Sequence, residues 1–502
     1  MQTTIAVGAA GNRRVWATAL STLIFAFSLS SCKVTSEDID YWKGTVKGPG
    51  KIVAVILADK YSMELRTDAA LALVDMERPD RDGTAELQQA LTRLDETERA
   101  ELVQGMVPGL EELMKRVESD APGGAPSARQ TRAKDAAFVL ITHAPPEVRA
   151  KLTRDVVDWY MQDFNGRSLA GNYSAEQVVR SLGTPAAAEL AKGLNARMPQ
   201  QALVKMAELV GQLADAPSRA DAAKRLVAIQ AEMEGQEFLD WVKQNVKEQA
   251  AQSNLELDAA KLTRVAEANR DNFINDGALP AMKWLASEPV VKQRLLQLAS
   301  GDLPGEAGKL RRVRALQALE GKVDAGDLDQ LLKLSLDSGN PTEVRDYAFD
   351  RVGDIKSPAA LPSLWPLVGG TSNDRLRWRA GELVLAIGGP AIVPEFFRRL
   401  PRGAKYAAEE LEGYATRMGQ MTPLPVDALR GQLTSTEWFS RVIAIRFFER
   451  KGTRADLAKL EALKSDQAAV EGEHWGKKKT VADVAKEALT AATQRLSQSE
   501  SP

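Results

Sequence analysis

Few residues of this 502-residue chain could do covalent or metal chemistry, because it contains a single Cys, Cys32, and two His, His143 and His474. One thiol can form neither an internal disulfide nor a cysteine-based zinc site. Neither histidine has a His, Cys or carboxylate partner at the spacing that places two ligands on one face of a metal-binding helix. We therefore expect no metal, no cofactor and no catalytic residue, and the position of Cys32 has to explain why the chain has a thiol.

Cys32 follows a segment with the three parts of an export signal. A short basic stretch comes first, an apolar run follows at residues 15–29, and small residues precede the cysteine. The apolar run is too short and wrongly flanked to be a membrane-spanning helix. Leu29-Ser30-Ser31-Cys32 resembles the lipobox of bacterial lipoproteins, which implies cleavage before Cys32 and a lipid on its thiol. The alternative is an ordinary buried cysteine in a soluble chain.

The lipobox resemblance implies a cellular location. Lipoprotein processing attaches acyl chains, and two or more chains anchor a protein stably, at about 0.8 kcal/mol per buried methylene. We therefore expect a protein that is tethered to the cell envelope and faces the periplasm. Lys33 stands where an Asp would favour retention in the inner membrane, so we expect the inner leaflet of the outer membrane. Tyr41 and Trp42 either reach the lipid headgroups or cover the first repeat.

The rest of the chain carries an internal repeat, clearest in residues 340–396. Apolar residues and an arginine recur thirty-two positions apart at helical spacing, with Pro or Gly at the breaks. We expect Asn340 to cap the helix that starts at Pro341, with Glu343 completing a capping box. The pattern resembles the HEAT repeat, which implies an all-α fold, an α-solenoid of HEAT-like helical hairpins. The recurring pairs are Val344/Leu376, Arg345/Arg377, Ala348/Ala380, Val352/Val384, Ile355/Ile387, Pro358/Pro390, Pro362/Pro394 and Leu364/Phe396.

The same pattern divides the chain into seven segments. The HEAT-like phase is strongest at residues 310–463 and weak after residue 186 in the middle of the chain. A run rich in Pro and Gly interrupts it at residues 121–128. The segments are a lipoprotein signal peptide (1–31), an acylated tether (32–47), an N-terminal HEAT-like helical segment (48–120), a flexible loop (121–128), an irregular helical block (129–256), a C-terminal HEAT-like array with a terminal cap (257–496) and a disordered tail (497–502).

The charge of the chain is balanced in total and uneven along its length. With 66 basic and 68 acidic residues, the net charge of −2 lacks the basic excess of a nucleic-acid-binding protein. Residues 61–120 sum to −8, whereas residues 371–460 sum to +5 and hold several of the few aromatic side chains. Arginine interleaved with aromatics is typical of protein-binding hot spots. The alternative is that these aromatics thicken the core.

The repeated arginines have two interpretations. In HEAT-like repeats the arginine of the second helix commonly pairs with an acidic residue at the preceding turn, and Asp374 with Arg377 suits this ladder. Asn340 with Arg345 suits it more loosely. The other interpretation is an anion-binding row, but repeat phase alone predicts the ladder.

A partner surface is expected on the other side of the same helices. On the helix that carries Arg377, several side chains fall outside the apolar phase, and the helix at residue 438 has looser equivalents. We expect these to contact a partner protein: Arg375, Trp378, Arg379, Arg446 and Arg450.

These observations favour a lipid-anchored envelope scaffold or adaptor that binds other proteins through the solenoid surface. The alternative is a regulator or enzyme of cell-wall polymer metabolism, which requires a cluster of close carboxylates on the concave face. We expect no enzyme, because the repeats run almost to residue 502 and leave no segment for a separate catalytic domain.

Overall fold

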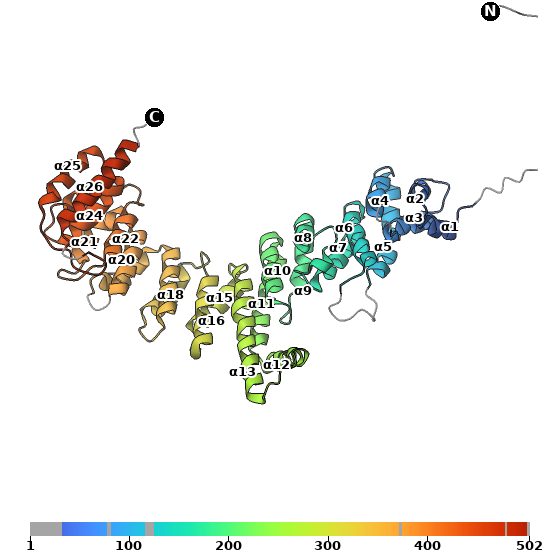
Figure 1. The fold of residues 1–502 in the computed structure, drawn as a ribbon, viewed down its shortest axis with the longest axis horizontal. Helices are drawn as coiled ribbons and strands as arrows, with labels where there is room; N and C mark the ends of the chain where they lie inside the picture. Colours follow the sequence, from blue (N-terminus) through green and yellow to red (C-terminus); the bar gives the residue numbers. More distant parts are fainter. Residues whose placement is uncertain (1–32, 78–81, 116–124, 371–373, 477–478, 499–502) are drawn as a thin grey trace, which may run out of the picture. The chain divides into compact units, whose positions relative to one another are not determined.

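The computed structural model describes residues 33–77, 82–115, 125–370, 374–476 and 479–498 (Figure 1). These residues form helices joined by loops, and their only β pairing is one bridge between Ala469 and Thr480. The predicted all-α class is confirmed. Packing divides the chain into two compact units, residues 1–113 and 114–502. The predicted signal peptide and Cys32 lie outside the described residues.

The first unit contains a helical hairpin of α2 and α3 within the segment predicted to be helical and HEAT-like (48–120). Ser62 accepts a hydrogen bond from the amide of Leu65 and so begins α3. Gly105 on α5 lies so close to α3 that a Cβ there would stand 2.7 Å from the Thr67 hydroxyl, so a small residue permits this packing. The helices are α1 (Ser36–Lys43), α2 (Gly48–Ile56), α3 (Met63–Asp75), α4 (Gly83–Leu91) and α5 (Glu96–Met114).

Within the predicted tether (32–47), residues 36–43 form the helix α1. Ile39 on α1 is buried, and Lys43 pairs with Asp75 on α3 at 3.0 Å. Tyr41 is 73% exposed and therefore does not cover the first repeat. A two-turn helix with one buried apolar residue leaves no periodic signal in the sequence.

The second unit begins with a block of helices of unequal length. Ser127 caps the first of them by accepting from the Gln130 amide, and the Gln130 side chain returns the bond, so the helix starts at the end of the predicted loop. The helices are α6 (Ala128–Leu140), α7 (Pro146–Met161), α8 (Ala175–Leu182), α9 (Thr184–Gly193), α10 (Gln200–Leu213), α11 (Ala216–Glu234) and α12 (Gln236–Gln252).

A long interrupted helix joins this block to the regular array. It runs through α13 (Ala259–Asn272), a π-helical turn η3 (Phe273–Ala278) and α14 (Leu279–Lys283). Single π turns inside α-helices are rare and often mark functional positions. Asn275 in this turn is 2% exposed, and its Nδ2 donates to the carbonyl of Ala307 at 3.4 Å.

The regular array alternates short and long helices. The long ones, together with α14 at the end of the interrupted helix, form one row, here called the B row, in which each helix packs on the next: α14, α16, α18, α20, α22, α24 and α26. The intervening helices α15, α17, α19, α23 and α25 each pack on the B-row helix that follows them, whereas α21 packs on α20. Bounds are α15 (Pro289–Ser300), α16 (Gly305–Ala318), α17 (Leu328–Leu336), α18 (Thr342–Ile355), α19 (Leu361–Val368), α20 (Asp374–Gly388), α21 (Val393–Arg399), α22 (Ala408–Met418), α23 (Val426–Gln432), α24 (Trp438–Lys451), α25 (Arg454–Ala462) and α26 (Val481–Gln498).

Contacts between neighbouring hairpins keep the sequence period. Arg377 bonds Glu410, thirty-three residues on, and Lys309 bonds Glu343, thirty-four residues on. The apolar repeat positions Ala348, Val352 and Ala380 are completely buried between the helices. The α-solenoid of HEAT-like hairpins is therefore confirmed. The last helix ends at Gln498, two residues into the predicted disordered tail, and residues 499–502 lie outside the described residues.

Candidate functional site

The ladder arginines Arg312, Arg377 and Arg441 are buried, and Arg345 is half-buried. Arg377 has no exposed side-chain surface; its Nε and Nη2 donate to the two carboxylate oxygens of Glu410 at 2.8 and 2.7 Å. Its Nη1 donates to Asp374 at 2.6 Å, as predicted. Burial alone lowers the pKa of Arg377, but hydrogen bonds and attraction to Glu410 and Asp374 outweigh it and raise that pKa, so the guanidinium stays charged.

In other repeats the ladder arginine bonds a backbone carbonyl. Arg312 donates to the carbonyl of Ala299 at the end of α15, and Arg345 donates to that of Ser335 at the end of α17. Arg441 bonds the carbonyl of Ser435, in the loop after α23, at 2.6 Å. Helices end with carbonyls that have no partner within the helix, and a guanidinium from the next helix can satisfy them. These arginines are therefore structural, but of the four only Arg377 has the predicted acidic partner at the preceding turn.

Asn340 has a different role from the predicted one. The N-cap of α18 is Pro341, which makes no side-chain cap. The Asn340 side chain instead accepts from Arg312 Nη2 at 2.6 Å and donates to the carbonyl of Leu334 at 3.0 Å. Asn340 therefore bonds Arg312 of the preceding repeat rather than Arg345.

The arginines predicted to bind a partner lie at the seams between B-row helices. We call Arg375, Arg379, Arg446 and Arg450 the seam arginines, because each pairs with a carboxylate on a neighbouring B-row helix. Their cross-helix partners are Asp346 and Asp350 on α18, Glu487 on α26 and Glu412 on α22. Arg375 is 65% exposed, whereas Arg446 is only 17% exposed. These pairs tie repeat to repeat and leave the cations partly accessible.

Trp378, the fifth predicted partner residue, is half-buried at the α20–α22 contact. Its indole nitrogen lies 3.0 Å from the position of a Cβ on Gly413, and that nitrogen is buried without a hydrogen-bond partner among the described residues. Trp378 thus packs at the contact between two repeats. Its indole N–H is available to an acceptor only after a local rearrangement.

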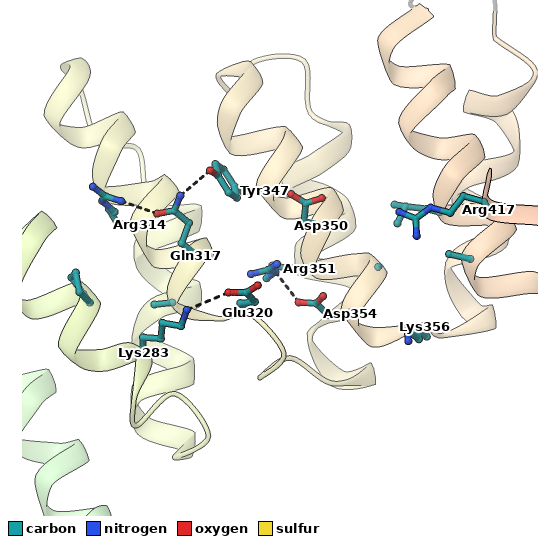
Figure 2. A pocket seen from close by; sticks show the side chains of 15 residues that line it. Lys283, Arg314, Gln317, Glu320, Tyr347, Asp350, Arg351, Asp354, Lys356 and Arg417 are labelled. Carbon is teal, nitrogen blue, oxygen red and sulfur yellow. Dashed lines mark hydrogen bonds and ion pairs between the residues drawn. The ribbon is translucent and has the colours of Figure 1, made fainter. Parts of the chain in front are cut away.

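A groove crosses the B row beside these seams (Figure 2). Its larger cavity, about 720 Å³, is lined by residues of α14, α16, α18, α20 and α22. Arg314 donates to Gln317 at 3.1 Å, and Gln317 donates to the Tyr347 hydroxyl at 2.8 Å, which fixes the side chains that form its wall. Five cations and three carboxylates line this cavity: Lys283, Arg314, Arg351, Lys356 and Arg417 face Glu320, Asp350 and Asp354.

Each carboxylate of this cavity already has a cation partner. Glu320 pairs with Lys283 at 3.2 Å, and Asp354 pairs with Arg351 at 2.9 Å. Asp350 pairs with the seam arginine Arg379. Two carboxylates that share a proton in acid–base catalysis must lie close together without such partners. The three carboxylates of this cavity are therefore not arranged as a pair that shares a proton.

A second cavity of about 640 Å³ lies next along the row, between the α13–η3 helix and α16 and α18. Leu310, Val313 and Ala268 give it an apolar wall, and Asn275 from the π turn also lines it. Arg314, Gln317 and Tyr347 line both cavities. The two cavities therefore adjoin at these three side chains, and together they are here called the B-row groove.

Comparisons with known proteins identify no family. No protein-family model and no curated protein sequence matches the chain. Similar solved structures include the karyopherin Kap121p bound to the SUMO protease Ulp1p, at 14% identity and a TM-score of 0.35 over 93% of this chain and 46% of that one. Importin beta in an ammonium sulfate condition matches at 11% identity and a TM-score of 0.26, over 92% of this chain and 68% of that one.

The chain thus spans about half the length of the Kap121p structures to which it is similar. A likeness at these TM-scores has no bearing on function. The solenoid assignment rests on this chain's own repeats and packing.

The B-row groove was not predicted from the sequence, although its residues stand at regular offsets from the ladder arginines. Groove residues stand two, five and six positions after a ladder arginine: Arg314, Gln317 and Ala318 after Arg312, and Tyr347, Asp350 and Arg351 after Arg345. These offsets place side chains beside the core stripe, on the face that neighbouring B-row helices share. The seam arginines Arg375 and Arg379 lie two positions to either side of Arg377. The predicted residues therefore lie at the edge of this face, and the residues at its centre were not predicted.

The remaining chemistry-bearing residues form no site. His474 lies 2.7 Å from Glu409, and this hydrogen bond raises the pKa of His474. Among the described residues no three His, Cys, Asp or Glu side chains are placed to hold a metal ion. In the same part of the chain, no helix has the length and apolar composition needed to cross a membrane.

Proposed function

We propose that this chain is a lipid-anchored scaffold of the bacterial cell envelope, held by acyl chains on Cys32 and binding other proteins through its solenoid. The supporting sequence feature is Leu29-Ser30-Ser31-Cys32 after an export-like apolar run. The structural observation that carries the proposal is the B-row groove, because its lining comes from five neighbouring B-row helices, four of which supply polar side chains, and so offers an extended contact. Periplasmic exposure and the inner leaflet of the outer membrane belong to the proposal.

The seam arginines extend this partner surface beyond the groove. Each holds a carboxylate on a neighbouring helix, and exposed ion pairs of this kind contribute about 0 to 1 kcal/mol. An acidic partner can therefore compete for Arg375 or Arg379 at small cost to the fold. Trp378 supports the same surface from the α20–α22 contact, and Arg446 and Arg450 continue it toward α26.

The alternative is a regulator or enzyme of cell-wall polymer metabolism. It requires a cluster of close carboxylates on the groove face. The groove carboxylates Glu320, Asp350 and Asp354 each face a cation instead, which favours the scaffold.

Affinity purification of the full chain, extracted from membranes after crosslinking, tests the proposal. We expect one or more envelope proteins to be recovered with the wild type. Cys32→Ala should abolish incorporation of an alkyne-labelled fatty acid, release the chain from membranes and reduce recovery of membrane-bound partners. Unchanged fatty-acid labelling in the variant would contradict the anchor, and recovery of no envelope protein by the wild type would contradict the scaffold.

A further inference from the structure

The B-row groove differs at its two ends. The end at α13 and α16 has an apolar wall next to charged residues (Asp271, Glu306, Lys309 and Glu343), and Leu310 in this wall remains 39% exposed. Val313 and Ala268 extend this surface. Covering an apolar wall that is open to solvent favours binding, because it removes apolar surface from water.

The other end, at α18 and α22, carries cations without full partners. Lys356 is exposed and makes no ion pair with any described residue, and it ends α18 with a left-handed backbone, φ 51°. Arg417 on α22 has only a long contact of 4.0 Å with Glu382. The other cations of the cavity are already paired (Figure 2). This end therefore has a free positive charge for a ligand.

The length of the groove sets the size of the ligand. From Leu310 on α16 to Arg417 on α22 the groove crosses three helix-to-helix spacings of about 8 to 10 Å each. An extended chain advances about 3.3 Å per residue, so about seven to nine residues fill it. A folded domain surface would meet the rims of such a groove, whereas an extended segment can follow it.

We propose that the B-row groove binds an extended peptide segment of about nine residues, apolar at the α16 end and acidic at the α22 end. This inference rests on the proposed scaffold function and adds the chemistry of the partner. The middle of the groove supplies Gln317, Tyr347 and Arg314, which can hydrogen-bond the peptide main chain. The two ends fix the direction in which the segment lies.

Two labelled nonapeptides test this proposal with the full-length chain in detergent. Each carries one Leu and three Glu at opposite ends of a Gly/Ser spacer, in the two possible chain directions. We expect one direction to bind more tightly and its affinity to fall with added salt, because exposed charges are screened. Replacing Glu by Lys, or Leu by Ser, should weaken binding at least tenfold. Failure of both acidic peptides to bind at up to about 1 mM would overturn the proposal.

Variants of the chain assign the binding to the groove. Lys356→Glu with Arg417→Glu should weaken the preferred peptide at least tenfold and remove the salt dependence, and Leu310→Asp should weaken it without changing that dependence. The matched control is Lys224→Glu with Arg398→Glu, at exposed positions outside the groove (side chains 70% and 75% exposed). Equal loss in the control, or no loss in the groove variant, would overturn the assignment.

The same groove variant separates this inference from the scaffold function. If crosslinked envelope proteins are recovered equally by the wild type and by Lys356→Glu/Arg417→Glu, the scaffold stands and the groove is not its contact. If the wild type recovers none, the scaffold itself fails. Circular dichroism of each variant confirms that a loss of binding is not a loss of fold.

Discussion

Arg377 offers the sharpest test of the ladder interpretation. Its guanidinium and the Glu410 carboxylate are 0% and 1% exposed and make two hydrogen bonds at 2.8 and 2.7 Å. Arg377→Met keeps an unbranched side chain and leaves Glu410 buried without its cation. Removing one partner of a buried ion pair costs about 3 to 5 kcal/mol.

The free energy of unfolding of the α20–α22 region should therefore fall by about that amount. Urea titration followed by tryptophan fluorescence reports it, because Trp378 lies on α20. The control is Arg375→Met on the same helix, which removes one exposed ion pair and should cost about 1 kcal/mol or less. The double variant Arg377→Met/Glu410→Leu has no buried charge at this position, so it should regain most of the lost free energy of unfolding. Tyr414, which donates to Glu410, keeps the carbonyl of Arg377 as an acceptor at 3.3 Å.

Equal effects of Arg377→Met and Arg375→Met would refute the reasoning, because the ladder arginine would then be no more structural than an exposed one. A double variant as unstable as the single one would show that the cost comes from packing rather than from the uncompensated charge.

Three further predictions follow from the contacts. Because Glu409 raises the pKa of His474 and His474 lowers that of Glu409, their hydrogen bond should be complete between about pH 4.3 and 6.5 and be lost as the pH rises through the raised pKa of His474. The backbone amide of Tyr406 donates to the Glu471 carbonyl, and its hydrogen exchange, corrected for intrinsic rates, should be slower at pH 6 than at pH 8. His474→Ala should remove this difference. Gly83→Ala should lower the melting temperature of the first unit by several degrees, because its Cβ would stand 1.9 Å from a backbone oxygen of α3; a variant as stable as wild type would contradict that close approach. Replacing all four seam arginines by Glu should lower the unfolding free energy by about 2 kcal/mol, since each new carboxylate faces another; urea titration measures it, and an unchanged midpoint would show that the seam pairs contribute nothing.

The fold was largely predictable because it repeats. Apolar periodicity near 3.6 and a break every sixteen residues or so mark each helix of residues 310–463 separately, and eight recurring positions align two hairpins. Helix ends can also be predicted where a side chain caps its own helix, as Ser62 caps α3. Each of these signals comes from residues close together in the sequence and does not depend on contacts with distant parts of the chain.

What the sequence did not reveal depends on contacts between repeats. Asn340 has the composition of an N-cap but bonds Arg312, twenty-eight residues earlier, and no local pattern distinguishes the two roles. Helix α1 is too short for periodicity. The π turn at Phe273–Ala278 lies in a segment that reads as ordinary helix, because the extra residue per turn is set by packing on α10 and α11.

In the candidate site, too, some features follow from local sequence and others depend on contacts between repeats. The seam arginines were found because they break the apolar phase of a clear helix. The free charge at Lys356 and Arg417 was not, since it depends on which neighbouring carboxylates are already paired, and pairing is decided across three helices. Lipid attachment at Cys32 stays a prediction from its sequence motif, because Cys32 lies outside the described residues.

A photo-crosslinking amino acid in place of Lys356, in the full chain in cells, tests the central claim most directly. The account predicts a discrete crosslinked envelope protein in the membrane fraction, absent when the crosslinker replaces Lys224 on α11 instead and depleted from that fraction when Cys32 is Ala. The same products from positions 356 and 224, or none from position 356 while the chain remains folded and membrane-bound, would contradict it.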